Sequence, residues 1–280
     1  MDEQMMAFAN SRSLLVPTAK DVDIHLIGCG GTGSWLAPHI ARIARLMAEK
    51  NSRKVRILFH DPDRVEAKNV YRQSFANAEI GLNKAEALAY RCAAAWGVNV
   101  VAVPKHFDAK AAVSDYDRHM GLFIGCVDNA AARRQIAEAA KSSTWSQKWW
   151  LDCGNSQNSG QILLGRSGLL KNEFPFGIEG KCTWLPLPSE QLPELLVSET
   201  EETPAANTQN LSCAELALID AQGLSINARM AAEAADVLLR MLVTGDLRRY
   251  QAYLNLSAGS TRSRYITEEA IAPYINPPAN

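Results

Sequence analysis

The sequence predicts a doubly wound α/β fold with a mostly parallel sheet. Two observations carry this prediction. Short β-rich runs alternate with helical stretches from residue 22 to about residue 165, and a cluster of glycines joins the first such run to the first helix. Strands that alternate with helices in this way form parallel sheets, which the helices cover on both faces.

The first strand is expected over residues 22–27 and leads into the glycine cluster GCGGTG at 28–33. Further strands are expected where short apolar runs follow, at 55–60, 98–107, 121–127, 149–154 and 160–165. Helices are expected between these strands, at 34–50, 81–96 and 130–142. In the first of these helices, apolar residues recur at the spacing of one helix face.

The second half of the chain has a different composition. Residues 171–212 are rich in Pro, Glu, Ser, Thr and Asn, which buries little surface and predicts a long flexible loop that crosses the sheet. A strongly helical run over 225–246 stops at Gly245, and the tail that follows contains a strand or a short helix. We therefore divide the chain into a core with an N-terminal arm, a crossover loop, and a C-terminal helix and tail that pack on the same domain, at 1–170, 171–222 and 223–280.

Composition excludes several classes of protein. The formal net charge of −1 gives no basic field for nucleic acid or an anionic membrane, and no apolar run is long enough to span a bilayer. The N-terminus lacks the pattern of a secretory signal, so we expect a cytoplasmic protein with reduced thiols. The six cysteines are scattered, without a CxxC pair, so a four-cysteine zinc site is not expected.

The glycine cluster between a strand and a helix is typical of phosphate binding. Its glycines permit a tight turn and let backbone amides approach a phosphate at the helix N-terminus. A turn without a ligand is the alternative. An acidic residue that ends the next strand would hold ribose hydroxyls, and Asp61 occupies that position. The pair of signals favours a nucleotide.

The segment after that strand carries more charge than a dinucleotide turn requires. Residues 59–73 read FHDPDRVEAKNVYRQ and are followed by Lys84, and Asp128 and Asn129 end a later strand. In a doubly wound sheet these strand ends open on one edge, where ligands bind. Two cations, Arg72 and Lys84, and a carboxylate able to hold Mg²⁺ suit a triphosphate attacked at its α-phosphorus, because charge develops on both fragments.

Four motifs together resemble one family. The stretches GCGGTG, DPDRVEAKNVYRQ, IGLNKAEA and CVDNAAAR are similar to those of the ubiquitin-activating (E1-like), ThiF and MoeB adenylating enzymes. The family loop Asp-x-Asp-x-Val-x-x-x-Asn-x-x-Arg-Gln matches residues 61–73 at every specified position. The resemblance covers about 22–165. Among its branches, the chain looks most like the bacterial ThiF-family proteins of the plasmid-associated PRTRC system.

The resemblance implies a Rossmann-like adenylation fold that uses ATP and Mg²⁺. Asp61 would bind the ribose with help from Asn69, Arg72 and Lys84 would contact the phosphates, and Asp128 would ligate Mg²⁺ near the α-phosphate. The implied nucleotide-binding set is Gly28, Gly30, Gly31, Gly33, Asp61, Asp63, Asn69, Arg72, Lys84, Asp128 and Asn129. The implied catalytic set is Asp128, Arg72, Lys84 and Cys213.

The family reaction adenylates the C-terminal carboxylate of a small ubiquitin-like (β-grasp) protein and releases pyrophosphate. A homodimer is expected by resemblance, and a conjugating-type enzyme is a candidate recipient of the product. Some members place an arginine from the N-terminus of one subunit in the site of the other. Arg12 is the only arginine before the first strand, and an ordinary surface arginine is the alternative.

Simpler interpretations remain for each residue. Asp61 could cap a helix, Arg72 and Lys84 could be solvated surface charges, and Asp128 with Asn129 could cap the helix that follows. For the whole chain, the alternatives are an NAD(P)-dependent dehydrogenase and a catalytically inactive scaffold.

The cysteines decide whether a thioester follows the adenylate. Cys213 lies near the place where thioester-forming relatives carry their cysteine, and Cys182 lies where zinc-binding relatives carry a CxxC. Three outcomes stay open: a thioester on Cys213, one on Cys182, or none. We expect the other four cysteines to be packing residues, at 29, 92, 126 and 153. Zinc is not expected, because the second cysteine of each pair is missing.

Overall fold

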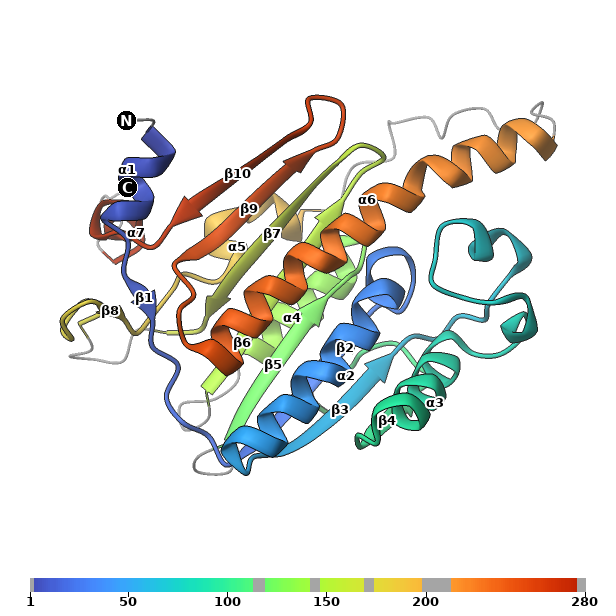
Figure 1. Cartoon of the computed structure of the whole chain (residues 1–280), viewed down its shortest axis with the longest axis horizontal. Coiled ribbons are helices and arrows are strands. Elements are labelled where there is room, and N and C mark those ends of the chain that lie inside the picture. The colour runs from blue at the N-terminus through green and yellow to red at the C-terminus, as the bar shows by residue number, and fades with distance from the viewer. Residues whose placement is uncertain (1–2, 113–118, 142–146, 169–173, 198–212, 276–280) are drawn as a thin grey trace.

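The computed structural model describes residues 3–112, 119–141, 147–168, 174–197 and 213–275. Its centre is an eight-stranded sheet in the order β10-β9-β7-β6-β5-β2-β3-β4, with helices packed on both faces (Figure 1). The predicted doubly wound α/β fold is confirmed.

Five neighbouring strands are parallel: β2 (Asp21–Ile27), β3 (Lys54–His60), β4 (Val100–Val103), β5 (His119–Gly125) and β6 (Gln147–Asn155). Every residue of β5 is buried, as expected for a strand covered on both faces. From β2 the chain moves outward to β3 and β4, then returns to place β5 on the other side of β2. The carboxyl ends of β2 and β5 therefore form a topological switch point, where open α/β sheets bind ligands.

The rest of the sheet is antiparallel. It consists of β7 (Ser159–Arg166), β9 (Arg249–Asn255) and β10 (Ser260–Tyr265). The strand β7 was predicted, and so was a strand or a short helix in the tail, which contains β10 and α7 (Glu268–Ile275). It missed β9, which follows the long helix after a short turn and mixes polar with apolar residues.

The helices form two layers. On one face lie α2 (Gly31–Asn51), α3 (Lys84–Trp96) and α6 (Cys213–Leu239), and α6 runs along α2 (Figure 1). The other face is covered by α4 (Ala130–Lys141), α5 (Pro188–Gln191) and the 3₁₀ helix η3 (Pro193–Leu196). Right-handed crossovers on opposite sides of the switch point require this division. Among the described residues, no helix is both long and apolar enough to cross a membrane.

The structure differs from the loop predicted over 171–222. Within it, β8 (Lys181–Cys182) pairs with β1 (Ser13–Leu14), α5 and η3 follow, and α6 already begins at Cys213. The composition of the whole segment is polar and concealed this order. A few apolar side chains are enough to anchor it, since they are buried, among them Trp184, Leu185, Leu187 and Leu195. The part of the predicted loop at 198–212 lies outside the described residues.

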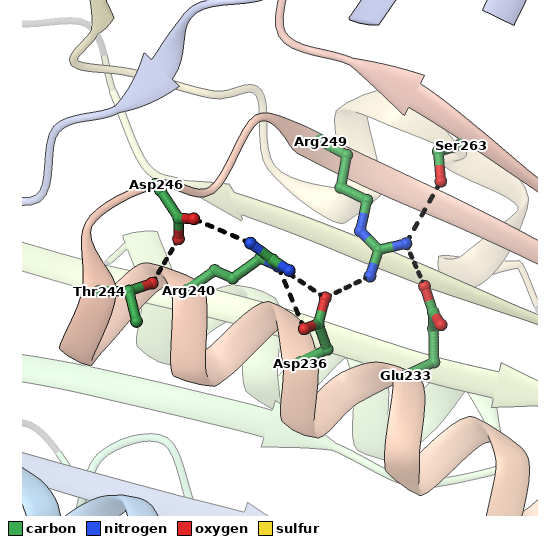
Figure 2. Close-up of polar contacts among 7 residues, drawn as sticks. All are labelled: Glu233, Asp236, Arg240, Thr244, Asp246, Arg249 and Ser263. Atoms are coloured by element: carbon green, nitrogen blue, oxygen red, sulfur yellow. Dashed lines mark hydrogen bonds and ion pairs between the residues drawn. The ribbon is translucent and has the colours of Figure 1, made fainter. Parts of the chain in front are cut away.

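An ion-pair network fastens the C-terminal end of α6 to the sheet (Figure 2). Arg249 on β9 lies between Glu233 and Asp236, and Asp236 also accepts a hydrogen bond from Arg240. The π-helical turn η5 (Arg240–Thr244) then ends at Gly245, whose φ of 69° is in the left-handed region. The remaining described helices are α1 (Glu3–Ala9) and two 3₁₀ turns, η1 (Ala67–Tyr71) and η2 (Asn77–Glu79).

Candidate functional site

A cavity of about 730 Å³ opens at the carboxyl ends of β2, β3 and β5. This volume lies within the range of about 300–1,000 Å³ that small-molecule sites occupy. The cavity brings together ten of the eleven residues predicted to bind a nucleotide: Gly28, Gly30, Gly31, Asp61, Asp63, Asn69, Arg72, Lys84, Asp128 and Asn129. Segments far apart in the sequence thus meet at the predicted edge of the sheet.

The eleventh residue, Gly33, packs against the backbone of the glycine turn itself. A Cβ atom on Gly33 would lie 1.9 Å from the carbonyl oxygen of Gly28, and one on Gly28 would lie 2.5 Å from that of Cys126. Gly28 also has a φ of 89°, which a side chain would strain. Both glycines are therefore required by backbone packing. Gly30 is different, because the nearest atom to its Cβ position is 3.8 Å away and it faces the cavity.

Asp61 is buried where the glycine turn (residues 28–33) meets the segment that follows β3 (residues 61–73, called the β3 loop below). One carboxylate oxygen accepts a hydrogen bond from the backbone N–H of Cys29 at 2.7 Å, and the other accepts one from Asp63 at 2.9 Å. Burial raises the pKa of Asp61, and the two backbone hydrogen bonds oppose that rise. Asp61 does not cap a helix; it fastens the glycine turn to β3 and faces the cavity.

Asn83 supports the site and was not predicted from the sequence. Its side-chain N–H₂ donates to the carbonyl oxygens of Asp61 and Asp63, each at 2.9 Å. Its side-chain oxygen accepts from the N–H of Glu86 and caps α3. An asparagine directly before a predicted helix is the signal of a cap, but nothing in the sequence indicates the bonds to the β3 loop.

The predicted cations are positioned from several elements. Lys84 is buried, with its ammonium 3.0 Å from a carboxylate oxygen of Asp63, so it is not a solvated surface charge. The Arg72 backbone carbonyl accepts hydrogen bonds from the indole of Trp35 at 3.2 Å and from Asn227 at 3.3 Å. These contacts hold the ammonium of Lys84 and the backbone of Arg72 at the cavity.

Asn69 lies inside the β3 loop. It is 3% exposed, and its side-chain oxygen accepts from the N–H of Glu66 at 2.9 Å, which forms the capping box of η1. Its first role is therefore to shape the loop that carries Arg72. The predicted contact with ribose would have to come from its amide nitrogen.

Asp128 and Asn129 have separate roles. The Asn129 side-chain oxygen accepts from the N–H of Ala132 at 2.8 Å and caps α4. Asp128 is exposed and faces the cavity, with one long hydrogen bond of 3.4 Å from Asn129. The capping alternative thus holds for Asn129 and leaves the carboxylate of Asp128 available to a ligand.

A buried ion pair supports the strand end before Asp128. Arg133 donates to the carbonyl oxygen of Val127 at 2.8 Å and to a carboxylate oxygen of Asp152 at 3.2 Å. Asp152 is fully buried, which raises its pKa to about 6 although Arg133 opposes the shift. Sequence analysis did not single out this pair. The aspartate lies inside a predicted strand, where nothing indicates its partner.

The residues present suit a magnesium ion that binds together with a nucleotide. Among the described residues, no group of three or more His, Cys, Asp or Glu side chains could hold a metal. Mg²⁺ commonly takes one or two protein carboxylates and completes its shell with water and substrate phosphates. The exposed carboxylate of Asp128 meets that requirement. The absence of zinc stays a prediction.

Four of the described cysteine side chains are poor candidates for a nucleophile. Cys182 is fully buried, and its thiol donates to the carbonyl oxygen of Trp184 at 3.0 Å. Burial raises the pKa of the Cys29 thiol and raises that of Cys92 to about 11. A hydrogen bond with Cys126, together with burial, raises the pKa of Cys153. A thiolate is therefore disfavoured at all three positions.

Cys213 and Arg12 are the two remaining predicted residues. Cys213 begins α6, and Asn227, which lines the cavity, follows it on the same helix by 227 − 213 = 14 residues. At 1.5 Å per residue this separation is about 21 Å along the helix axis. The backbone of Arg12 donates to Ile266, and its guanidinium lies 3.7 Å from Glu268. Arg12 therefore contacts the C-terminal tail and does not line the cavity in this subunit.

The sequence model of the ThiF family matches residues 1–254 of this chain. This chain belongs to the ThiF family. The match reaches well beyond the region 22–165 that carries the recognisable motifs, and it includes the N-terminal arm, α6 and β9. A search of curated proteins finds no match.

Several solved structures share the fold. PaaA is 17% identical with a TM-score of 0.53, over 88% of this chain and 64% of its own. MccB of E. coli with ATP is 16% identical with a TM-score of 0.52, over 88% and 63%. MccB with AMPCPP and MccA is 13% identical with a TM-score of 0.51, over 99% and 68%. This ThiF-family chain spans about two thirds of those proteins, and identities this low show the fold alone.

Proposed function

We propose that this protein is an ATP- and Mg²⁺-dependent adenylating enzyme that activates the C-terminal carboxylate of a small ubiquitin-like protein. One observation carries the proposal: the glycine turn, Asp61, Lys84 and the exposed carboxylate of Asp128 all line one cavity at the switch point. Membership of the ThiF family supports E1-like adenylation in general.

The arrangement suits attack on an α-phosphate. An oxygen of the substrate carboxylate would form a bond to the α-phosphorus, and the bond from that phosphorus to the bridging oxygen of the pyrophosphate would break. The products are an acyl adenylate and pyrophosphate. Arg72, Lys84 and the amides of the glycine turn would stabilise the negative charge on the phosphates. Asp128 would hold Mg²⁺, which supplies further charge neutralisation when it is bound with the nucleotide.

The alternatives are less well supported. A dehydrogenase would use the glycine turn and Asp61, but it gives no role to Lys84 or Asp128, and the chain belongs to the ThiF family. An inactive scaffold would not require the polar walls of the cavity to be kept. It predicts ATP binding without pyrophosphate exchange, which separates it from the enzyme.

A thioester step would use Cys213, because Cys182 is closed off by burial. Cys213 lies about 21 Å along the helix axis from Asn227, which lines the cavity, so the step would require the start of α6 to move. Cys213→Ala should retain adenylation and lose any reducible adduct with the ubiquitin-like protein. An adduct that persists in Cys213→Ala would exclude this cysteine. The homodimer, the trans role of Arg12 and the PRTRC placement stay predictions.

The first test needs no partner protein. The melting temperature of the purified protein is measured with ATP and Mg²⁺, with NADH and with NADPH. A ligand at 100 times its dissociation constant adds about 2.7 kcal/mol to the free energy of unfolding. We expect stabilisation by ATP with Mg²⁺ that is lost in Asp128→Ala. A shift with NADH alone would overturn the proposal.

A further inference from the structure

A side chain outside the recognised motifs joins three walls of the cavity. Asn227 lies on α6 and is 3% exposed. Its oxygen accepts hydrogen bonds from the Asn155 amide at 3.3 Å and from the Thr32 hydroxyl at 3.5 Å, and its N–H₂ donates to the Arg72 carbonyl at 3.3 Å. One amide thus bonds the start of α2, the end of β6 and the loop of Arg72.

The same amide explains why residue 31 is glycine. A Cβ atom on Gly31 would lie 2.6 Å from the side-chain oxygen of Asn227 and 2.9 Å from its nitrogen. Real Cβ atoms essentially never approach this closely, so a side chain at 31 would displace the amide. The sequence predicts that Gly31 binds the nucleotide. In the structure Gly31 also leaves the space that the Asn227 amide fills.

Neighbouring bonds make the connection stiff. The Ser34 hydroxyl donates to the Gly31 carbonyl at 3.0 Å and accepts from the N–H of Ser74 at 2.9 Å. The Trp35 indole shares the Arg72 carbonyl with Asn227. The glycine turn and the segment 72–74 are therefore joined by the side chains of Ser34 and Trp35 from α2. Asn227 adds a connection from α6.

We propose that Asn227 is a positioning residue that holds the Arg72 loop in place relative to the amides of the glycine turn. Both segments line the cavity in which a triphosphate would bind under the proposed function, on which this inference rests. An amide can serve both walls because it donates to one and accepts from the other. Without it, Ser34 and Trp35 still join the two segments, but the bond that ties both of them to α6 is lost.

The test compares ATP binding, in the presence of Mg²⁺, among four proteins by calorimetry. These are the wild type, Asn227→Ala, Asn227→Asp and a matched control, Gln251→Ala. Gln251 is also a buried amide that joins two segments, since it donates to Gln191 at 2.9 Å, but it lies on β9 and does not line the cavity.

We expect Asn227→Ala to weaken ATP binding by about three- to tenfold, the usual consequence of losing hydrogen bonds of this kind. Asn227→Asp keeps the acceptor, loses the donor to Arg72 and adds a negative charge near the phosphates, so its loss should be larger. Gln251→Ala should lower the melting temperature and leave ATP affinity unchanged. Wild-type affinity in Asn227→Ala, or an equal loss in Gln251→Ala, would overturn the inference.

A second measurement tests the contact without any nucleotide. Gly31→Ala should strongly lower the free energy of unfolding, and adding Asn227→Ala should restore part of that loss because the added methyl group then has space. Strictly additive effects would show that the two residues are not in contact and would contradict the inference. If the wild type fails to bind ATP, the proposed function falls and the positioning role falls with it, even where this coupling is observed.

Discussion

The molecule has two clusters of charged residues, one at the end of α6 and one at the switch-point cavity. In the network at the end of α6, Arg249 and Arg240 share Asp236, and each has a further acidic partner (Figure 2). At the switch-point cavity, Lys84 pairs with Asp63, but Asp128 has no ion-pair partner within the described part of the chain. The density of charge does not distinguish the two regions. What distinguishes the site is a carboxylate directed toward open space.

The difference predicts opposite consequences of mutation. A charge whose partners are all in the protein contributes to stability, and its loss leaves those partners uncompensated. A charge that awaits a ligand contributes little to the folded state, and its loss is observed when the ligand is added. The following changes are ordered by the size of the expected effect.

Lys84→Ala should give the largest change, in ATP affinity. Lys84 is buried at the cavity wall, so its charge acts on a phosphate with little screening by water. We expect binding about 30- to 1,000-fold weaker, the range for removal of one partner from a buried charge contact. Calorimetry with ATP and Mg²⁺ measures it, with Lys105→Ala, an exposed lysine of the same cavity, for comparison. Equal losses in both variants would contradict a specific role for Lys84.

Acid should destabilise the cavity side of the sheet. His25 and His60 are stacked and hydrogen-bonded at 3.0 Å, and burial lowers their pKa values to about 3 and about 4. The neutral forms contribute their full stability above the ordinary pKa of about 6.5, and this contribution is lost as the pH falls from there toward 4. The reason is that the unfolded chain takes up protons that the folded chain excludes.

Melting temperatures measured between pH 7.5 and pH 4 test this effect, and we expect them to fall by roughly several degrees. The double variant His25→Phe/His60→Phe should show a flatter profile than the wild type. His106→Gln removes an exposed histidine from the rim of the same cavity and should leave the profile unchanged. An unchanged slope in the double variant would place the acid sensitivity elsewhere.

Asp236→Ala should lower stability by about 1–2 kcal/mol, because the side chain is partly exposed and accepts from two arginines. ATP affinity should stay at the wild-type value, since the network lies away from the cavity. Urea denaturation gives the stability and calorimetry gives the affinity. Weaker ATP binding in this variant would show that the two regions are coupled through α6.

Asn129→Ala should have the smallest effect, about 1 kcal/mol of stability, because it removes the cap of α4. Asn129→Ser should restore most of that loss, since serine also caps a helix. A loss of ATP affinity that serine does not restore would indicate that Asn129 contacts the nucleotide directly.

The sequence was informative where the chemistry is local. The five parallel strands are predicted within a few residues, because each is a short apolar run that ends at a polar or glycine-containing segment. The polar motif residues Asp61, Asn69 and Arg72 line one cavity with the glycine turn and Asp128, because strand order in a doubly wound sheet places these strand ends side by side.

What the sequence could not predict depends on contacts between distant segments. Asn227 and Asn155 look like ordinary polar residues, and the packing of α6 against α2 and β6 brings them together. Asn83 is visible as a helix cap, but its bonds to the β3 loop are not. The burial of Cys182 likewise depends on β8 pairing with β1, across 168 residues of chain at Ser13 and Lys181.

The two outer strands of the sheet limit how copies of this chain could associate. On one side β4 has only four residues, and on the other β10 presents exposed Arg262 and Arg264. Short strands and charged side chains at an edge are the features by which proteins prevent the sheet of one molecule from continuing into that of another. A homodimer of this protein would therefore be built through helices or loops, and its interface should be sensitive to substitutions there and insensitive to proline in β4 or β10.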